Sequence, residues 1–249
     1  MDTAILDYLP EIDVQDGVVC GRVPLDGYRR GWGLQFGDLA RHVEKEALFI
    51  EACEAGCSTT LVMATKRMNM YVLATRFLPR LAERNIVEFG SYKGGNAIFL
   101  ATVLRAVDPT AKVYALDTYS GMPATDKSVD AHGAGDFKDA ALEQFQQRIV
   151  ALGLTNLVPV QGLFHETFPG LAPERKFAMA HIDADIYASV KYAQDAVWPR
   201  MTPGGYVVYD DAEVSSCLGA TQAVEELIMD RRIHSEQVWP HFVFRAGLA

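Results

Sequence analysis

Four aspartates of this chain stand in two short groups, and each group follows a run of apolar residues. Asp183 and Asp185 come after the stretch AMAHI, and the pair Asp210 and Asp211 comes after GYVVY. If both runs are neighbouring parallel strands, the four carboxylates meet at the carboxyl ends of the strands, where open α/β sheets bind ligands. So many like charges cannot all stay ionised together without a counter-ion. A hard divalent cation with oxygen ligands, such as Mg²⁺, is the simplest one.

A glycine-rich turn follows a third strand-like stretch, IVEF, and leads into a predicted helix. Its glycines stand at positions 90, 94 and 95, which let a ligand approach the backbone closely. The spacing is not that of a dinucleotide-binding fingerprint. Glu88 stands just before the turn, where its charge would repel a pyrophosphate and suit a cationic ligand.

Two other strand ends complete the outline of a nucleotide-like site. Asp117 ends the stretch VYALD, and a carboxylate there can accept both hydroxyls of a ribose. The stretch QGLF at 161–164 follows another strand and could line a slot for an adenine. Plainer interpretations remain open: Asp117 as a turn residue, and Asp183 and Asp185 as caps of a helix that begins near Tyr187.

The elements that must position these residues begin near residue 85, where a strand and helix alternation starts. This order predicts a mostly parallel, doubly wound sheet. The predicted strands are 85–89, 112–116, 156–160, 177–182 and 204–209, and the predicted helices are 95–107, 138–151, 187–198 and 219–230. The ends 233–237 and 241–244 would add a closing antiparallel pair, which brings the sheet to seven strands.

Before residue 85 the pattern is helical and then irregular. One helix is predicted behind Asp38 as its N-cap, with Leu39, Val43, Ala47 and Ile50 on one face, and another from Lys66 to Pro79. The first 37 residues are rich in glycine, aromatic residues and arginine, which predicts a loop-rich arm. We expect this arm to cover the acceptor pocket, either its own or that of a neighbouring subunit in a homo-oligomer.

Composition restricts the function. With 249 residues, 49% of them hydrophobic, the chain can bury one substantial core. A net charge of −9 argues against nucleic acid as a partner and favours a small-molecule substrate. No apolar run approaches the roughly 18 to 20 residues that span a bilayer, and the first residues do not form a signal sequence. We therefore expect a soluble cytoplasmic protein, and its four cysteines are too few for a disulfide framework.

Taken together, the blocks EFGxxxGG, LDTYSGMP, QGLF, HIDADIYASV and GGYVVYDD resemble the macrocin O-methyltransferase family. The similarity covers roughly residues 60–230. Members of that family methylate sugar hydroxyls of macrolide, aminocoumarin and enediyne antibiotics, the last of the calicheamicin type. The resemblance implies a class I S-adenosylmethionine methyltransferase fold that uses Mg²⁺. We expect an N-terminal arm and helical cap at 1–65 and a methyltransferase domain at 66–249.

The resemblance also implies roles for individual residues. Asp183, Asp210 and Asp211 resemble the metal ligands, and Asp185 resembles the general base. The residues placed around the cofactor are Glu88, Gly90, Ser91, Asp117, Ser120, Gly162 and Leu163. Two departures stand out: Leu61-Val62-Met63-Ala64 replaces the Thr-Met that often begins the cofactor-capping helix, and Ala212 and Glu213 replace an aromatic residue after the aspartate pair.

The function expected from these arguments is Mg²⁺-dependent transfer of a methyl group from S-adenosylmethionine to a deoxysugar hydroxyl of a glycosylated natural product. A catechol-type O-methyltransferase, a fold-related hydroxylase with iron at the His181 and Asp183 pair, and a silent cofactor-binding subunit are the alternatives. His181 is either a core histidine or a partner of the acidic residues. The polar segment around His132 is either a lid or a surface loop.

Overall fold

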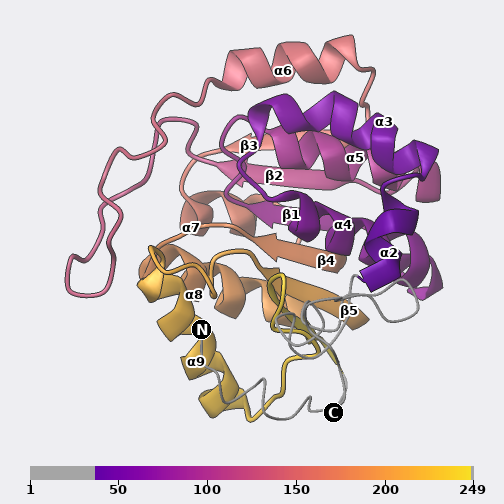
Figure 1. Ribbon diagram of the computed structural model, residues 1–249. Helices are drawn as coiled ribbons and strands as arrows, with labels where there is room; N and C mark the ends of the chain where they lie inside the picture. Colours follow the sequence, from indigo (N-terminus) through magenta and orange to yellow (C-terminus); the bar gives the residue numbers. More distant parts are fainter. Residues whose placement is uncertain (1–36, 248–249) are drawn as a thin grey trace, which may run out of the picture.

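The computed structural model describes residues 37–247. The predicted arm at 1–36 lies outside the described residues. Figure 1 shows a central sheet with helices on both faces. Its six strands are β1 Ile86–Phe89, β2 Val113–Asp117, β3 Leu157–Gln161, β4 Phe177–Ile182, β5 Met201–Tyr209 and β6 Phe242–Arg245. The five strands predicted between residues 85 and 209 are confirmed.

The strand order is β3-β2-β1-β4-β5-β6, and only β6 runs antiparallel to its neighbour. The order runs backwards through the first three strands and forwards from β4, so β1 and β4 flank the point where it reverses. Doubly wound sheets open a crevice at that point, outside the carboxyl ends of the strands. The register pairs Glu88 with His181 and Ile182 with Tyr209, which brings the residues that follow β1, β4 and β5 to one edge.

The prediction of a seventh strand was wrong for the described chain. The segment 233–237 pairs with β6 through an isolated antiparallel bridge between Gln237 and Val243 and does not form a strand. The side chains of Gln237 and His241 turn inward instead, where both contact the amide of buried Asn69. Because these buried polar groups need partners, they hold the segment against the body of the protein, and its pairing with β6 stays limited to the one bridge.

The helices α5 Gly95–Val107, α8 Tyr187–Val197 and α9 Leu218–Arg231 match the predicted ranges closely, whereas α6 Leu142–Ala151 begins later than predicted. Near the start, α2 Gly37–Val43 and α3 Ala47–Gly56 are separate helices. Asp38 lies inside α2 and not before it, and Ile50, which the pattern placed on the apolar face, is exposed. Helix α4 Ala64–Val72 continues as a π turn at Leu73–Phe77, and Pro79 lies in the 3₁₀ turn that ends it.

Two apolar layers hold the sheet. One packs α3, α4, α5 and α6 on one face, and the other packs α7 Phe164–Thr167, α8 and α9 on the opposite face. The division of the chain predicted between residues 65 and 66 falls inside helix α4. Helix α3 packs on α5, and apolar residues of the segment 43–65 belong to the same core as the sheet. Within 37–247 no helix is long and apolar enough to cross a membrane.

Candidate active site

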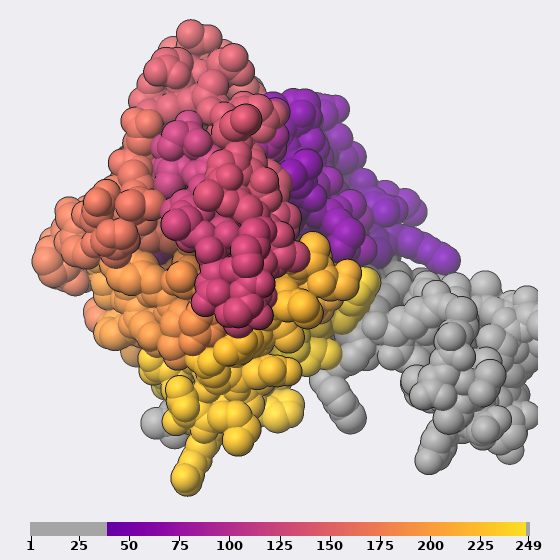
Figure 2. Space-filling model, turned by 90° about the vertical axis from the view of Figure 1, so that its left-hand side faces the viewer, coloured from indigo at the N-terminus to yellow at the C-terminus, as the bar shows by residue number. Residues whose placement is uncertain are grey.

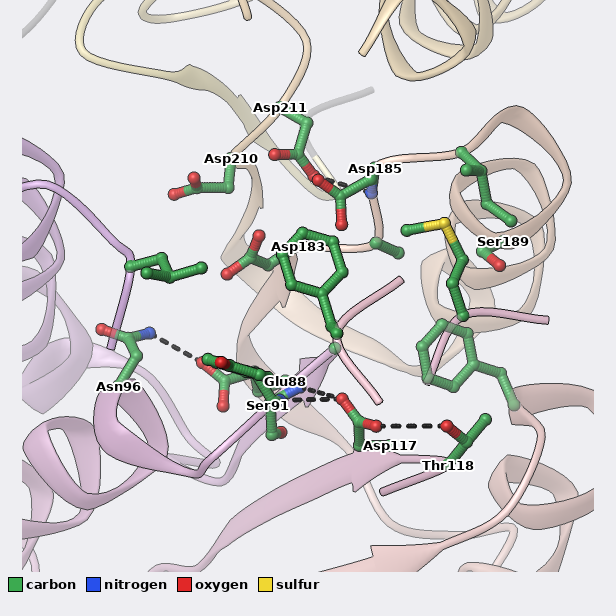
Figure 3. Close-up of a pocket in the computed structure, with 18 of the residues that line it drawn as sticks. Glu88, Ser91, Asn96, Asp117, Thr118, Asp183, Asp185, Ser189, Asp210 and Asp211 are labelled. Carbon is green, nitrogen blue, oxygen red and sulfur yellow. Dashed lines mark hydrogen bonds between the residues drawn. The ribbon is translucent and has the colours of Figure 1, made fainter. Parts of the chain in front are cut away.

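A cavity of about 730 Å³ opens at the carboxyl edge of the sheet, beside β1 and β4. Nine of the eleven predicted site residues line it: Glu88, Gly90, Ser91, Asp117, Leu163, Asp183, Asp185, Asp210 and Asp211. The other two, Ser120 and Gly162, are not part of its wall, and Ser120 is exposed. Figure 3 shows the four aspartates of β4 and β5 at one end and Glu88, Ser91 and Asp117 at the other.

Gly90 makes this arrangement possible. Its φ is +90°, and a side chain there would collide with the main-chain carbonyl oxygen of Asp183. Only glycine tolerates both the backbone conformation and the contact. The turn after β1 therefore lies directly against the turn after β4, which joins the two ends of the cavity.

The side chains of Asp183, Asp210 and Asp211 come close enough to share one ion. One ligand oxygen from each lies within 4.8 Å of the others. Burial raises the pKa of Asp183 and of Asp211 well above the ordinary value, and the neighbouring carboxylates add to the shift. Within 37–247 the carboxylate of Asp183 accepts no hydrogen bond. An unpartnered carboxylate beside two others is a donor set that fits a hard cation such as Mg²⁺.

Asp185 follows Asp183 in a left-handed turn, with φ of +57°. Its main-chain N–H donates to Oδ2 of Asp211 at 2.9 Å, so the turn is fixed on the acidic pair of β5. Its side chain lines the cavity, separate from the group of three. Burial raises the pKa of this carboxyl as well.

A buried lysine enters the cluster from α4. Nζ of Lys66 lies 2.8 Å from Oδ2 of Asp210 and 3.1 Å from Oε1 of Glu213. Burial lowers the pKa of Lys66, but the Asp210 carboxylate outweighs that effect and the net shift is upward. Desolvation would raise the pKa of Asp210, yet its hydrogen bond with His181 and the other positive neighbours hold it well below the usual range. Asp210 is thus the carboxylate of the cluster whose charged form its neighbours favour most.

His181 links the two ends of the cavity from beneath. Its Nδ1 lies 3.1 Å from Oε1 of Glu88, and its Nε2 lies 3.3 Å from Oδ1 of Asp210. Burial lowers the pKa of His181, but the two carboxylates outweigh it and raise the pKa to about 9. The side chain is a partner of the acidic residues, one of the two interpretations left open. Asn96 of α5 also donates to Oε1 of Glu88 at 2.7 Å.

Glu88 has one carboxylate oxygen to spare. Although the residue is fully buried, its Oε2 has no hydrogen-bond partner among the described residues. Buried acceptors in folded proteins are nearly always paired, so this oxygen on the cavity wall suits a donor or a positive charge on a ligand.

Asp117 organises the glycine-rich turn. Its Oδ2 accepts from the main-chain N–H groups of Ser91 and Tyr92, each at 2.8 Å, and its Oδ1 accepts from Tyr119 at 2.7 Å. Burial raises the pKa of Asp117, and these three backbone donors oppose that shift. The residue does act as a turn residue, as the plainer interpretation held. Oγ1 of Thr118 also lies 3.5 Å from Oδ1, but a hydroxyl has one proton to donate and this one has a shorter bond, at 2.6 Å, to the carbonyl of Gly121. A carboxylate has about four acceptor positions, so the one beside Thr118 is open to a stronger donor.

Several wall residues carried no motif that sequence reasoning used. Apolar side chains line part of the cavity, with Leu61 and Met63 exposed at its rim and Met122, Phe137 and Val214 around it. Met122 and Phe137 come from the connection between β2 and α6, so this connection forms part of the cavity wall and is not only a surface loop. For Lys66 a signal existed: it stands four residues from both Val62 and Met70, which are buried, so a charge falls on an apolar helical face.

The residues 56–238 match the model of the family described as macrocin-O-methyltransferase (TylF). This match spans most of the chain and includes every predicted site residue. The chain belongs to the macrocin O-methyltransferase family. The resemblance stated from the sequence is confirmed.

Two curated relatives in antibiotic pathways show the extent of the similarity. An 8-demethyl-8-(2,3-dimethoxy-alpha-L-rhamnosyl)-tetracenomycin-C 4'-O-methyltransferase of Streptomyces olivaceus is 34% identical over 146 residues, which are 55% of this chain and 56% of that protein. A mycinamicin III 3''-O-methyltransferase of Micromonospora griseorubida is 26% identical over 62% of this chain and 63% of its own length. The aligned part of the chain thus spans little more than half of these relatives.

Solved structures confirm the fold of this family member. A calicheamicin methyltransferase superposes with a TM-score of 0.61 at 18% identity, over 95% of this chain and 97% of that one. The O-methyltransferase NovP superposes with a TM-score of 0.60 at 23% identity, over 72% of this chain and 78% of that one. The fold is that of class I S-adenosylmethionine methyltransferases, with six strands in the described sheet.

Proposed function

We propose that this protein transfers the methyl group of S-adenosylmethionine to a sugar hydroxyl of a glycosylated natural product, with Mg²⁺ as the metal. The observation that carries the proposal is one cavity with two chemically different ends. Three carboxylates that suit a hard cation lie at one end, and a buried free carboxylate oxygen beside a glycine-rich turn lies at the other. A methyltransferase of this kind needs both.

The end near β1 and β2 suits the cofactor. Asp117 has an acceptor position left for a ribose hydroxyl, and it fixes the N–H groups of Ser91 and Tyr92 on the turn. Oε2 of Glu88 offers negative charge to an ammonium or sulfonium group. Gly90 and Leu163 line the same end. Bound there, S-adenosylmethionine would supply an electrophilic methyl group.

The end near β4 and β5 suits the metal and the acceptor. Asp183, Asp210 and Asp211 would hold Mg²⁺, which when bound would chelate an acceptor diol and lower the pKa of its hydroxyl. Asp185, which lies beside this group and faces the cavity, would take the hydroxyl proton. Orientation of the acceptor oxygen by fixed residues can contribute roughly 7–11 kcal/mol to such a reaction.

The names of the relatives and the apolar wall support the acceptor class. The tetracenomycin and mycinamicin enzymes are named for methylation at positions of sugar-bearing antibiotics. Leu61, Met63, Met122 and Phe137 offer an apolar surface to an aglycone.

A catechol also presents a chelating diol, so a catechol-type acceptor is the second candidate. We also retain a cytoplasmic homo-oligomer as a proposal.

The experiment uses purified protein, methyl-labelled S-adenosylmethionine and a panel of glycosylated antibiotic precursors, their aglycones and simple catechols. Label should pass to glycosides only, should stop with EDTA and should return with Mg²⁺. Asp185→Asn should abolish transfer while leaving cofactor binding and Mg²⁺ affinity unchanged, and Asp230→Asn on the exposed side of α9 serves as its control. Transfer that continues in EDTA, or only to catechols, would contradict the proposal.

A further inference from the structure

A second group of metal-binding side chains lies beside the acidic cluster, and its members come from three separate elements. They are His132 in the connection between β2 and α6, Asp185 after β4, and Cys217 directly before α9. One ligand atom of each lies within 4.8 Å of the others. Oδ1 of Asp185 is 3.8 Å from Nε2 of His132 and 3.5 Å from Sγ of Cys217.

These separations are close to those of a tetrahedral zinc site, and the ligand atoms would have to move together by a few tenths of an ångström or more to hold the ion. Zinc bonds of about 2.0–2.1 Å to nitrogen and oxygen and about 2.3 Å to sulfur place the ligand atoms roughly 3.3–3.6 Å apart. The donor set of nitrogen, sulfur and oxygen also differs from that of the three neighbouring aspartates, which is all oxygen. Sulfur and imidazole ligands favour zinc, whereas a purely carboxylate set favours magnesium.

The ring of His132 is already oriented as a ligand. Its Nδ1 lies 3.2 Å from Oδ2 of Asp136, and the ring packs on Phe137 with centroids 5.6 Å apart. Histidines that bind metals in proteins typically donate their other ring N–H to a carboxylate, which fixes the tautomer. With Nδ1 engaged by Asp136, the nitrogen that faces Asp185 is the one with a free lone pair.

The backbone on which His132 stands is docked against the other two ligands. Oδ1 of buried Asp130 accepts from the N–H of Tyr187 at 2.8 Å, which ties the connection to the start of α8, two residues beyond Asp185. A side chain at Gly219, two residues beyond Cys217, would collide with Asp130. In Figure 2 the tip of the connection meets the orange and yellow parts of the surface, which contain α8 and α9.

We propose that His132, Asp185 and Cys217 form a binding site for zinc or a similar thiophilic divalent cation, separate from the magnesium site. The Cys217 thiol would lose its proton to solvent on binding, and of the three ligands only Asp185 lines the cavity. The ion would tie the connection to α9. Its effect on catalysis rests on the proposed function: with Asp185 bound to zinc, the enzyme loses its base and is inhibited.

Cobalt provides a readout that does not depend on activity. The reference protein for this experiment is the variant Cys20→Ser, Cys53→Ser and Cys57→Ser, which leaves Cys217 as its single cysteine. Titrated with Co²⁺ in Mg²⁺ buffer, it should show one equivalent of a near-ultraviolet thiolate-to-cobalt absorption, which Zn²⁺ removes. Cys217→Ser should abolish that absorption. The absorption surviving in that variant, or never appearing in the reference protein, would overturn the proposal.

Two substitutions in the otherwise unaltered chain test the site if the serine protein is unstable. His132→Asn should weaken Zn²⁺ binding measured by competition with a chelating dye, and Asp136→Asn should weaken it about 10–100-fold through the ring orientation. His42→Asn on exposed α2 is the control. Equal zinc affinity in all three variants would refute the site. The inhibitory effect is tested at saturating Mg²⁺: Zn²⁺ should inhibit methyl transfer by the native protein and should inhibit the Cys217→Ser variant less. If the protein transfers no methyl group at all, the proposed function fails, but the cobalt result still tests the zinc site.

Discussion

Nζ of Lys66 lies 2.8 Å from Oδ2 of Asp210, and both side chains are buried. The acidic cluster therefore contains a permanent positive charge from α4 in addition to any ion it binds. Together with His181, this lysine keeps the pKa of Asp210 low, whereas burial and the neighbouring carboxylates raise the pKa values of Asp183 and Asp211. The counter-ion that the sequence argument required is in part a side chain.

Lys66→Met should destabilise the protein when no metal is present. Removing one partner of a buried ion pair costs about 3–5 kcal/mol, because the other charge stays buried without compensation. Urea unfolding with and without Mg²⁺ measures this, and Mg²⁺ should restore more stability to the variant than to the native protein. Lys45→Met on the exposed chain between α2 and α3 is the control. An equal Mg²⁺ effect on both proteins would show that the lysine does not share the charge of the cluster.

Asp183→Asn should remove Mg²⁺ binding while preserving the fold and cofactor affinity. The amide keeps the shape of the side chain but loses the charge of a carboxylate that no described residue satisfies. Calorimetry should show a loss beyond the roughly 10–100-fold that removal of an outer partner of a metal causes. Asp210→Asn should lose binding as well. Native Mg²⁺ affinity in both variants would mean that these residues are not the metal ligands.

Asp117→Ala should weaken S-adenosylmethionine binding far more than acceptor binding. The variant loses a carboxylate that fixes two N–H groups of the turn, and charge-assisted hydrogen bonds contribute roughly 1.5–3 kcal/mol each. Calorimetric dissociation constants for the cofactor, set beside the acceptor KM, separate the two effects. Asp108→Ala at the far end of α5 is the matched control. If the cofactor dissociation constant does not change, Asp117 serves the turn alone.

Gly90→Ala should be much more damaging than Gly153→Ala. Both glycines have positive φ, but Gly153 has open space around it, whereas a side chain at Gly90 meets the carbonyl of Asp183. The left-handed backbone alone costs an alanine about 1–2 kcal/mol. The difference between the two unfolding free energies therefore isolates the contact between the turns after β1 and β4. Equal losses in both variants would show that the turns can separate freely.

The strand-end rule explains how much of the site was predictable. Asp117, Asp183 and Asp210 each end or follow a strand, and parallel strands place such residues at one edge whatever their separation in sequence. Lys66 and His132 follow no such rule. Lys66 reaches Asp210 across 144 positions from a helix, and His132 reaches Asp185 from a connection without periodicity. The expected seventh strand failed for a related reason, because inward contacts of Gln237 and His241 are not visible in an apolar pattern.

The reversal of strand order also determines the order in which the strands of the sheet can pair during synthesis. Chains emerge from the ribosome amino-terminus first, and Glu88 meets its neighbour His181 only 93 positions later. Until β4 appears, the partial sheet of β1, β2 and β3 presents one side of β1 as an unpaired apolar edge, a template for pairing with other chains. The nascent protein thus contains Lys66 and the residues of β1 and β2 at the proposed cofactor end before Asp183, Asp210 and Asp211 have been synthesised. The exposed edge of β1 can pair wrongly with another chain most readily while the segment between β3 and β4 is being translated.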